Sequence, residues 1–319
     1  MRRLEDWARV PAAEMAQLYR VEHERWRNAL DWDTTETLDA LERARLNGRV
    51  PGFVARQASG AVAGWTYYVL QGSELQIGAL VASSPGTTAG LLDAVLASAA
   101  ATVASRTLFF AHTDAPGIAG ALAGRDFTVT SEHYLSCPLD RSPAVGLGPR
   151  EIATLPPWHD DDVAAAAELL QDAYGGPDAT RAFAPGNGLA DWHGYVQQLT
   201  RATGCGRFLP ALSPVLRCED GRLDGAALVT AVSDTSAHLA QLAVRASRGG
   251  SGCGARLLAA ALAGAQRTGY ARISLLVNDA NVRARRLYAE AGFETRGTFV
   301  SATRPRRRAQ LMTPSAPAA

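Results

Sequence analysis

A glycine cluster between two apolar runs constrains this chain more than any other feature. The runs cover residues 239–244 and 273–277, and each has the length of a buried strand. The glycines between them are Gly249, Gly250, Gly252 and Gly254. Residues 255–266 then place apolar side chains at helical spacing, and a further helical segment, 281–291, stops at Gly292. The stretch predicts a strand, a glycine turn, a helix, a strand and a helix.

The glycine turn has the properties of an anion site. Glycine lets the backbone approach a ligand because no Cβ stands in the way. The first turn of the next helix adds free N–H groups and the positive end of its dipole, which together favour phosphate. Arg245 and Arg248 flank the turn and can add charge-assisted contacts. The predicted phosphate-binding residues are Arg248, Gly249, Gly250, Ser251, Gly252, Cys253, Gly254 and Ala255. The alternative is a tight turn whose glycines serve geometry alone.

Two other phosphate motifs fit the turn poorly. A Walker loop needs Lys and then Ser or Thr after its last glycine, whereas Gly254 is followed by Ala255. A dinucleotide fingerprint is formally present at Gly250, Gly252 and Ala255, with Asp279 after the next strand. That fingerprint should follow its strand directly and open a large doubly wound sheet. Several residues intervene here and too few follow, so an NAD-dependent oxidoreductase is the less favoured alternative.

The whole stretch resembles the GNAT superfamily of N-acetyltransferases. Val244 and residues 249–254 are similar to its pyrophosphate motif, with Gly252 and Gly254 in the last two fixed positions. A second signature of the family matches at Leu275, Val277, Asn281, Ala284, Leu287, Tyr288, Gly292 and Phe293. One position departs from the pattern: the family's Gln or Arg is Gly249 here, and Arg248 stands one residue early. The resemblance therefore implies that backbone amides hold the pyrophosphate here without the side chain that the family supplies at this position.

The order of elements around this stretch occurs twice in the chain. The first copy is predicted as two helices, three strands, a helix, a strand, a helix and a strand, at 11–30, 34–46, 53–56, 62–70, 74–81, 91–103, 108–111, 116–123 and 127–138. The second begins with helices at 163–174 and 191–200 and strands at 208–218 and 225–232, and ends with a strand at 299–303. A repeat of this size predicts two copies of one fold.

We expect an α/β fold of two tandem GNAT-like domains, each a mixed, mostly antiparallel sheet flanked by helices. The predicted domains are residues 1–140 and 151–304, with a linker at 141–150 and a disordered tail at 305–319. Aligning Gly292 with Asp126 places Leu122 opposite Tyr288, and Pro85, which has no N–H, in the first copy's turn. The first copy is therefore predicted to be degenerate. A tandem pair with one working half is similar to the mycothiol synthases.

The composition limits the partners. Lys and Arg number 32 against 31 Asp and Glu, and a net charge of +1 gives no reason to expect nucleic acid as the main partner. The 4 cysteines form no CxxC pair, so we expect no structural metal site or disulfide framework and a cytoplasmic location. No run approaches a membrane span. The oligomeric state is open between monomer and homodimer.

The resemblance implies acetyl-CoA as the cofactor and a direct transfer of acetyl to an amine. The two parallel strands are expected to diverge at their carboxyl ends, where the backbones of Leu242 and Val244 can bond the pantetheine arm. Asn281 either contacts this arm or caps its helix. Tyr288 matches the family's general acid for the leaving thiolate, and the Val244 N–H is the expected donor to the oxyanion.

The general base is not evident in the sequence. The position that carries Glu in many relatives is Gln241, and His238, an odd number of residues earlier, is predicted on the opposite face of the strand. The acceptor pocket is predicted from aromatic residues of the second copy, Tyr174, Phe183, Trp192, His193 and Tyr195, which can equally pack the two halves together. We expect an N-acetyltransferase acting on a primary amine of a small molecule. The alternative is a non-catalytic acyl-CoA sensor.

Overall fold

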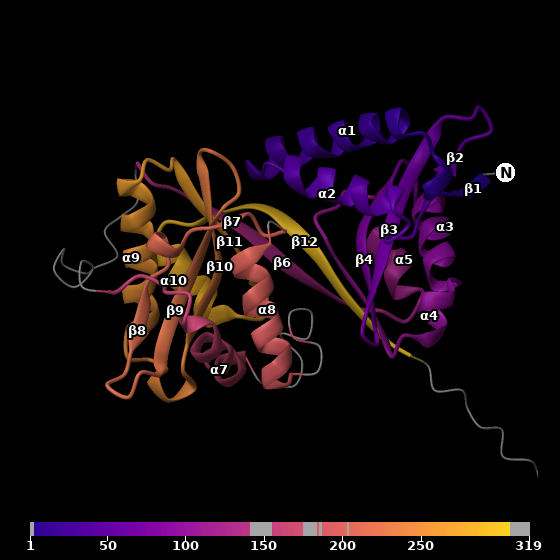
Figure 1. Cartoon of the computed structure of the whole chain (residues 1–319). Coiled ribbons are helices and arrows are strands. Elements are labelled where there is room, and N and C mark those ends of the chain that lie inside the picture. Colours follow the sequence, from indigo (N-terminus) through magenta and orange to yellow (C-terminus); the bar gives the residue numbers. More distant parts are fainter. Residues whose placement is uncertain (1–2, 141–154, 175–183, 185–186, 203, 307–319) are drawn as a thin grey trace, which may run out of the picture. The chain divides into compact units, whose positions relative to one another are not determined.

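The computed structural model describes residues 3–140, 155–174, 184, 187–202 and 204–306 (Figure 1). The predicted linker at 141–150, the tail beyond residue 306 and Phe183 lie outside these described residues. Contacts divide the described chain into two compact units. Unit 1 contains residues 3–7, 51–129 and 301–306, and unit 2 contains residues 8–50 and 130–300.

The predicted repeat is present in the order of elements. The first copy contains α1 (Ala12–Leu30), α2 (Thr35–Leu46), β2 (Gly52–Arg56), β3 (Val62–Gln71), β4 (Glu74–Ala82), α3 (Pro85–Leu96), β5 (Arg106–Ala111), α5 (Ile118–Ala123) and β6 (Thr128–Pro138). The second contains α7 (Asp162–Tyr174), α8 (Leu189–Arg201), β8 (Val215–Arg217), β9 (Leu223–Ala231), β10 (Ser236–Val244), α9 (Cys253–Arg267), β11 (Arg272–Asn278), α10 (Val282–Glu290) and β12 (Glu294–Pro305). Short elements are β1 (Arg3–Asp6), η1 (Trp7–Arg9), α4 (Ala99–Val103), β7 (Arg207–Phe208), η2 (Pro210–Leu212) and η3 (Ala246–Arg248).

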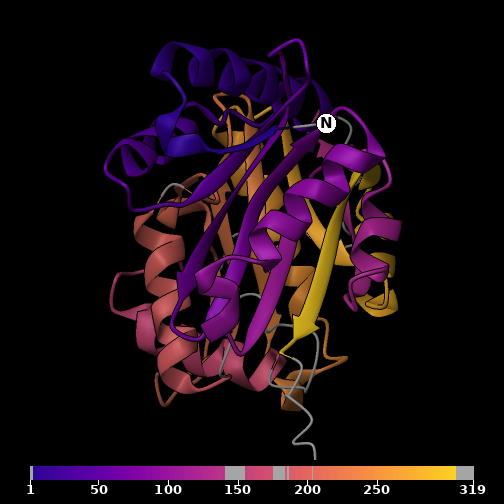
Figure 2. The ribbon, with the colours of Figure 1, turned by 90° about the vertical axis from the view of Figure 1, so that its right-hand side faces the viewer.

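Unit 1 is built on the strand order β1-β2-β3-β4-β5. The neighbours β1 to β4 pair antiparallel, while β4 and β5 pair in parallel. The helix α3 packs across β2, β3 and β4 (Figure 2). Its apolar face is fully buried at Leu91, Leu92 and Val95, because one side of an amphipathic helix must be removed from water for the sheet to be stable.

Unit 2 has the strand order β6-β11-β10-β9-β7, with β8 also paired to β9. Only β10 and β11 pair in parallel, as the sequence predicts. The helix α9 packs on one face of this sheet, where Leu257, Leu258 and Ala261 are completely buried. The helices α7 and α8 pack on the other face through Leu169, Trp192 and their neighbours (Figure 1). Each sheet face is therefore covered by helices, which gives the predicted mixed α/β fold.

The segment that joins α1 to α2 belongs to unit 2. The Tyr134 hydroxyl donates to the Leu30 carbonyl at 3.0 Å, and the Asp33 N–H donates to the Val232 carbonyl at 2.7 Å. The Trp32 ring lies 5.0 Å from the His238 ring, centroid to centroid. The units defined by contacts therefore group the first helical pair with the second copy, whereas the boundary expected at 140/151 follows the sequence repeat.

Candidate functional site

The parallel strands β10 and β11 separate halfway along their length. They pair from Ser236 and Arg272 as far as Leu239 and Leu275. Immediately after this point β10 has one extra residue, Ala240, relative to β9. A bulge of this kind bends its strand. Beyond it, β10 continues beside β9 and β11 continues beside β6, so the predicted divergence is present.

The bulge corrects one expectation about the faces of β10. We expected His238 and Gln241 on opposite faces of β10 because they are an odd number of residues apart. The extra residue Ala240 shifts the alternation by one position, so both side chains lie on the same face. His238 lies against Trp32 and Tyr134, and Gln241 donates to the Tyr195 hydroxyl of α8 at 2.6 Å. Leu239 and Leu242 instead both pack on the α9 side. His238 and Gln241 therefore share the face opposite α9.

The backbone of β10 presents polar groups to the gap between the strands. The Arg245 N–H donates to the Asp224 carbonyl at 2.8 Å, so these residues form a hydrogen-bonded antiparallel pair. Hydrogen-bonded and non-hydrogen-bonded pairs alternate along an antiparallel ladder. Val244 and Leu242 therefore form non-hydrogen-bonded pairs with residues of β9, and their N–H and C=O groups point toward β11. One of these groups has a partner: the Tyr174 hydroxyl donates to the Leu242 carbonyl at 2.9 Å.

The aromatic residues predicted for the acceptor pocket gather beside this opening. Tyr174 stacks on Trp192 with ring centroids 6.0 Å apart, and Trp192 meets Tyr195 edge to face at 6.1 Å. Burial raises the pKa of Tyr174 to about 12 and raises the pKa of Tyr195 further. Trp192 is fully buried and His193 is half-buried. Tyr174, Trp192 and Tyr195 thus lie together on the α7–α8 side of β10.

The glycine turn follows β10 after Arg245 and the short η3, and it leads into α9. Gly250 and Gly252 have φ of +85° and +81°, values that other residues adopt only with strain. Gly252 is the N-cap of α9, and no side chain bonds to the first N–H groups of this helix. The Gly254 backbone lies between Val244 and Leu287, each 3.7 Å from the position that a Cβ would take. The N–H groups of Gly249 and Ser251 donate within the turn, to the carbonyls of Ala246 at 3.1 Å and Arg248 at 3.3 Å, while the first N–H groups of α9 are uncapped.

The two arginines that flank the turn in sequence are engaged by β9 and its surroundings. The Arg248 guanidinium lies 3.2 Å from the Asp224 carboxylate, and Arg245 donates to the Leu223 carbonyl at 3.0 Å. A third arginine, Arg283 of α10, lies over the glycines: its Nη1 is 3.5 Å from where a Cβ on Gly249 would stand. No sequence motif indicates Arg283, because the second family signature leaves its position unspecified.

The helix α10 carries Asn281 and Tyr288. The Asn281 side chain accepts a hydrogen bond from the Ala284 N–H at 3.1 Å, so it caps α10, which was the alternative expected for it. Tyr288 is 7% exposed and lies 5.7 Å from the Phe293 ring. Burial, and secondarily the nearby Tyr174, raises the pKa of Tyr288 well above its ordinary value. The raised pKa keeps the hydroxyl protonated. Within the described residues no group bonds to this hydroxyl, so it is available to donate.

A carboxylate that the sequence analysis missed lies on the same face as His238. Glu132 of β6 is opposite Asn278 of β11, whose side-chain amide donates to it at 2.7 Å. It stands two residues before Tyr134, which stacks on His238, so period-two alternation places both on one face. Burial raises the pKa of Glu132, and the bond from Asn278 opposes that rise. Only the long-range pairing of β6 with β11 reveals this residue, so no local motif could have indicated it.

The first copy repeats this backbone arrangement, but side chains occupy the corresponding positions. Its strand β4 also has one extra residue, Gly78, but the Tyr67 ring lies so close that a Cβ there would be 2.2 Å from it. The Ser84 side chain caps α3 by accepting from the Thr87 N–H at 3.3 Å. Asp126, aligned with Gly292, adopts the same positive φ, at 62°. The backbone repeats, but α3 has a side-chain cap where α9 has none.

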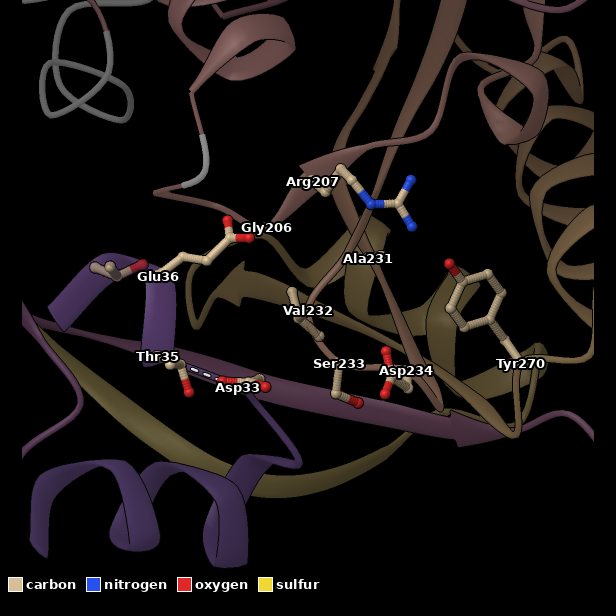
Figure 3. Close-up of a pocket in the computed structure, with 11 residues that line it drawn as sticks. Asp33, Thr35, Glu36, Gly206, Arg207, Ala231, Val232, Ser233, Asp234 and Tyr270 are labelled. Carbon is tan, nitrogen blue, oxygen red and sulfur yellow. Dashed lines mark hydrogen bonds between the residues drawn. The ribbon is translucent and has the colours of Figure 1, made fainter. Parts of the chain in front are cut away.

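Two open hollows lie at the other end of the unit 2 sheet. One, of about 240 Å³, is lined by residues that include Asp33, Glu36, Arg207, Asp234 and Tyr270 (Figure 3). A neighbouring hollow of about 340 Å³ shares Arg207, Asp234 and Tyr270. Asp234 and Tyr270 precede the first residues of β10 and β11, whereas the glycine turn follows the last residue of β10. The hollows are therefore separate from the turn.

Two classes of feature are absent from the described part of the chain. Its His, Cys, Asp and Glu residues form no group able to hold a metal ion. None of its helices combines the length and the apolar character needed to cross a bilayer.

The splayed parallel strands, the glycine turn and the helices on both faces define the fold of the GCN5-related N-acetyltransferases. An enzyme of this class from Sphaerobacter thermophilus aligns with a TM-score of 0.60 at 16% identity, over 80% of each chain. A tandem GNAT protein from the clavulanic acid biosynthesis pathway aligns with a TM-score of 0.55 at 17% identity, over 80% of this chain and 82% of the other. These likenesses show the tandem fold.

Comparison of the sequence matches part of the chain to a protein family. Residues 164–293 match the model described as "Acetyltransferase (GNAT) family". Proteins of Mycobacterium tuberculosis and Mycobacterium bovis, each named an uncharacterized N-acetyltransferase, are 38% identical over 79 residues, which is 25% of this chain and 51% of theirs. The match thus spans about half the length of these relatives. Residues 164–293 are therefore similar to the GNAT acetyltransferases, as the signature around Tyr288 predicts.

Proposed function

We propose that this protein is an N-acetyltransferase that moves acetyl from acetyl-CoA directly to a primary amine of a small molecule. The observation that carries the proposal is the separation of β10 from β11 at the Ala240 bulge, together with the uncapped glycine turn beyond the end of β10. Such an opening can accept the two amides of a pantetheine arm as an added strand would, and the turn can hold a diphosphate. The family generally uses this donor.

The second copy supplies groups for each part of the donor. The free amides of the turn and of the first residues of α9 hold the diphosphate, and the polar backbone groups of Leu242 and Val244 bond the pantetheine arm. The acetyl carbonyl then lies beside Val244, whose N–H stabilises its oxyanion. The amine enters from the face that carries Gln241 and Tyr195, which lies opposite α9. The filled site of the first copy supports a structural role for that copy.

Proton transfer assigns roles to two further side chains. Attack by the amine expels a thiolate, and the Tyr288 phenol, kept protonated by burial, donates a proton to it. Before the attack the amine must lose a proton. Glu132 takes this proton through water, because it is a half-buried carboxylate of raised pKa on the acceptor face. Gln241 cannot serve, since an amide has no basic site, and it instead orients the Tyr195 hydroxyl.

Release of free thiol from acetyl-CoA in the presence of a panel of amines tests the function, with calorimetry of coenzyme A binding alongside. Binding and amine-dependent thiol release are expected. Binding without release for any amine would identify an acyl-CoA sensor. If coenzyme A fails to bind, the proposal is wrong, and binding of a nicotinamide dinucleotide instead would revive the oxidoreductase alternative.

A further inference from the structure

The glycine turn lacks one cation that its own motif would provide. The position at which the family places Gln or Arg is Gly249, and glycine has no side chain to reach a phosphate. Amides at a helix N-terminus attract an anion, but charge-assisted bonds from a guanidinium are about twice as strong as neutral ones. A positive group from elsewhere in the fold would therefore strengthen the binding of a diphosphate on this turn.

The flanking arginines are poorly placed to fill this role. Arg248 pairs with Asp224, and Arg245 is engaged with the Leu223 carbonyl and lies 4.0 Å from the Asp172 carboxylate. Asp172 also accepts from the Ala246 N–H at 2.7 Å, which fixes this end of β10. Both guanidinium groups already have acidic neighbours on the β9 and α7 side, so their charge is compensated before any ligand arrives.

Arg283 lies where the missing side chain would project. Its Nη1 is 3.5 Å from the Cβ position of Gly249, and its Nη2 is 4.0 Å from that of Gly250. The side chain is exposed, and it makes no hydrogen bond or ion pair with any residue that the structure describes. The other arginines of α10 differ: Arg285 pairs with Asp279 at 2.7 Å and Arg286 pairs with Glu290 at 2.8 Å.

We propose that Arg283 binds the diphosphate of the acyl donor and replaces, from α10, the cation that the turn lacks at Gly249. This inference rests on the proposed function. The guanidinium lies beside Gly249 and Gly250, so a diphosphate on the free amides of the turn can receive donors from the backbone and from Arg283.

The test compares kinetics of the wild type and Arg283→Gln with three acyl donors. With acetyl-CoA we expect the KM to rise roughly 10-fold while kcat stays within about twofold, since the lost contact is remote from the thioester. Acetyl-dephospho-CoA, which keeps the diphosphate but has no 3′-phosphate, should show the same rise. S-acetylpantetheine, which has no diphosphate, should give equal KM values for both proteins. Arg286→Gln on the same helix is the matched control and should leave all three values unchanged.

Each result has a defined meaning. A rise that disappears with acetyl-dephospho-CoA would move the contact to the 3′-phosphate and overturn the proposal. An equal rise with S-acetylpantetheine would show a general disturbance of α10 and would also overturn it. So would an unchanged KM for acetyl-CoA in a variant whose melting temperature matches the wild type. Failure of the wild type to bind coenzyme A in calorimetry would instead overturn the proposed function, which keeps the two failures distinct.

Discussion

The Tyr174 hydroxyl donates to the Leu242 carbonyl at 2.9 Å, in the gap where β10 has left β11. A phenol from α7 thus occupies a backbone acceptor that an incoming pantetheine amide would use. In Tyr174→Phe this acceptor is unoccupied before the donor binds. We expect the Kd for coenzyme A to fall about fivefold, which corresponds to about 1 kcal/mol for one net hydrogen bond. Titration calorimetry with coenzyme A checks the result. Weaker binding would instead mean that Tyr174 helps to hold the arm.

Tyr288 is buried against Phe293, and its hydroxyl has no partner in the described chain. Removing the hydroxyl therefore leaves no protein group without a bond, and Tyr288→Phe should fold normally. If the phenol protonates the leaving thiolate, kcat should fall about 100-fold while the Kd for coenzyme A stays within a factor of about two. Thiol release and calorimetry measure the two quantities. A collapse of affinity with unchanged turnover per bound donor would contradict the role.

We expect Glu132 to determine the acidic limb of the profile of kcat/KM against pH. Its raised pKa means that the carboxylate is lost as the pH falls through a value above the ordinary glutamate range, so kcat/KM should decline there. Glu132→Gln should lower kcat/KM about 100-fold and remove this limb. Asn278→Ala removes a bond that lowers this pKa, so the limb should move to higher pH. Glu290→Gln on the exposed side of α10 is the control, and a limb that survives in Glu132→Gln would contradict the assignment.

We expect the buried His238 ring to make the folded protein less stable as the pH falls. Its ring is buried beside Trp32 and bonds to the Ser274 hydroxyl at 2.9 Å, and burial lowers its pKa to about 3 from 6.5. Between these values the unfolded chain binds the proton and the folded chain does not, so the free energy of unfolding falls as the pH drops through this window. His238→Asn should flatten this dependence by up to about 1.4 kcal/mol per pH unit. Urea unfolding from pH 7 to pH 4 measures the slope. The exposed His159→Asn is the control, and equal slopes for His238→Asn and the wild type would show that this pKa is not depressed.

The local elements of the second copy could be predicted from periodicity alone. The strands expected at 239–244 and 273–277 lie within β10 and β11, and the helix expected at 255–266 lies within α9. Here short-range spacing and the contacts of the folded chain agree, because glycines mark both ends of α9. The last strand, expected at 299–303, is longer, since β12 begins at Glu294, where polar residues give no apolar signal.

The site required information that no local pattern contains. The extra residue Ala240 is visible only as a mismatch with β9, and it reverses the face expected for His238 relative to Gln241. Glu132 reaches the site by pairing with a strand 146 residues away in sequence, through Asn278. Arg283 reaches the turn from a different helix. Each depends on tertiary pairing, which one sequence without relatives does not show.

The position of Trp32 in unit 2 has a consequence for how the protein is made. The Ser236 hydroxyl bonds to Asp31, 205 residues away in sequence, so the unit that contains the candidate site uses both early and late parts of the chain. Synthesis must pass β12 before this unit can close, and contacts of such separation slow folding. A truncation that starts at residue 151 would lack β6 and expose the face around His238. We expect it to aggregate, although it retains every residue of the family signature.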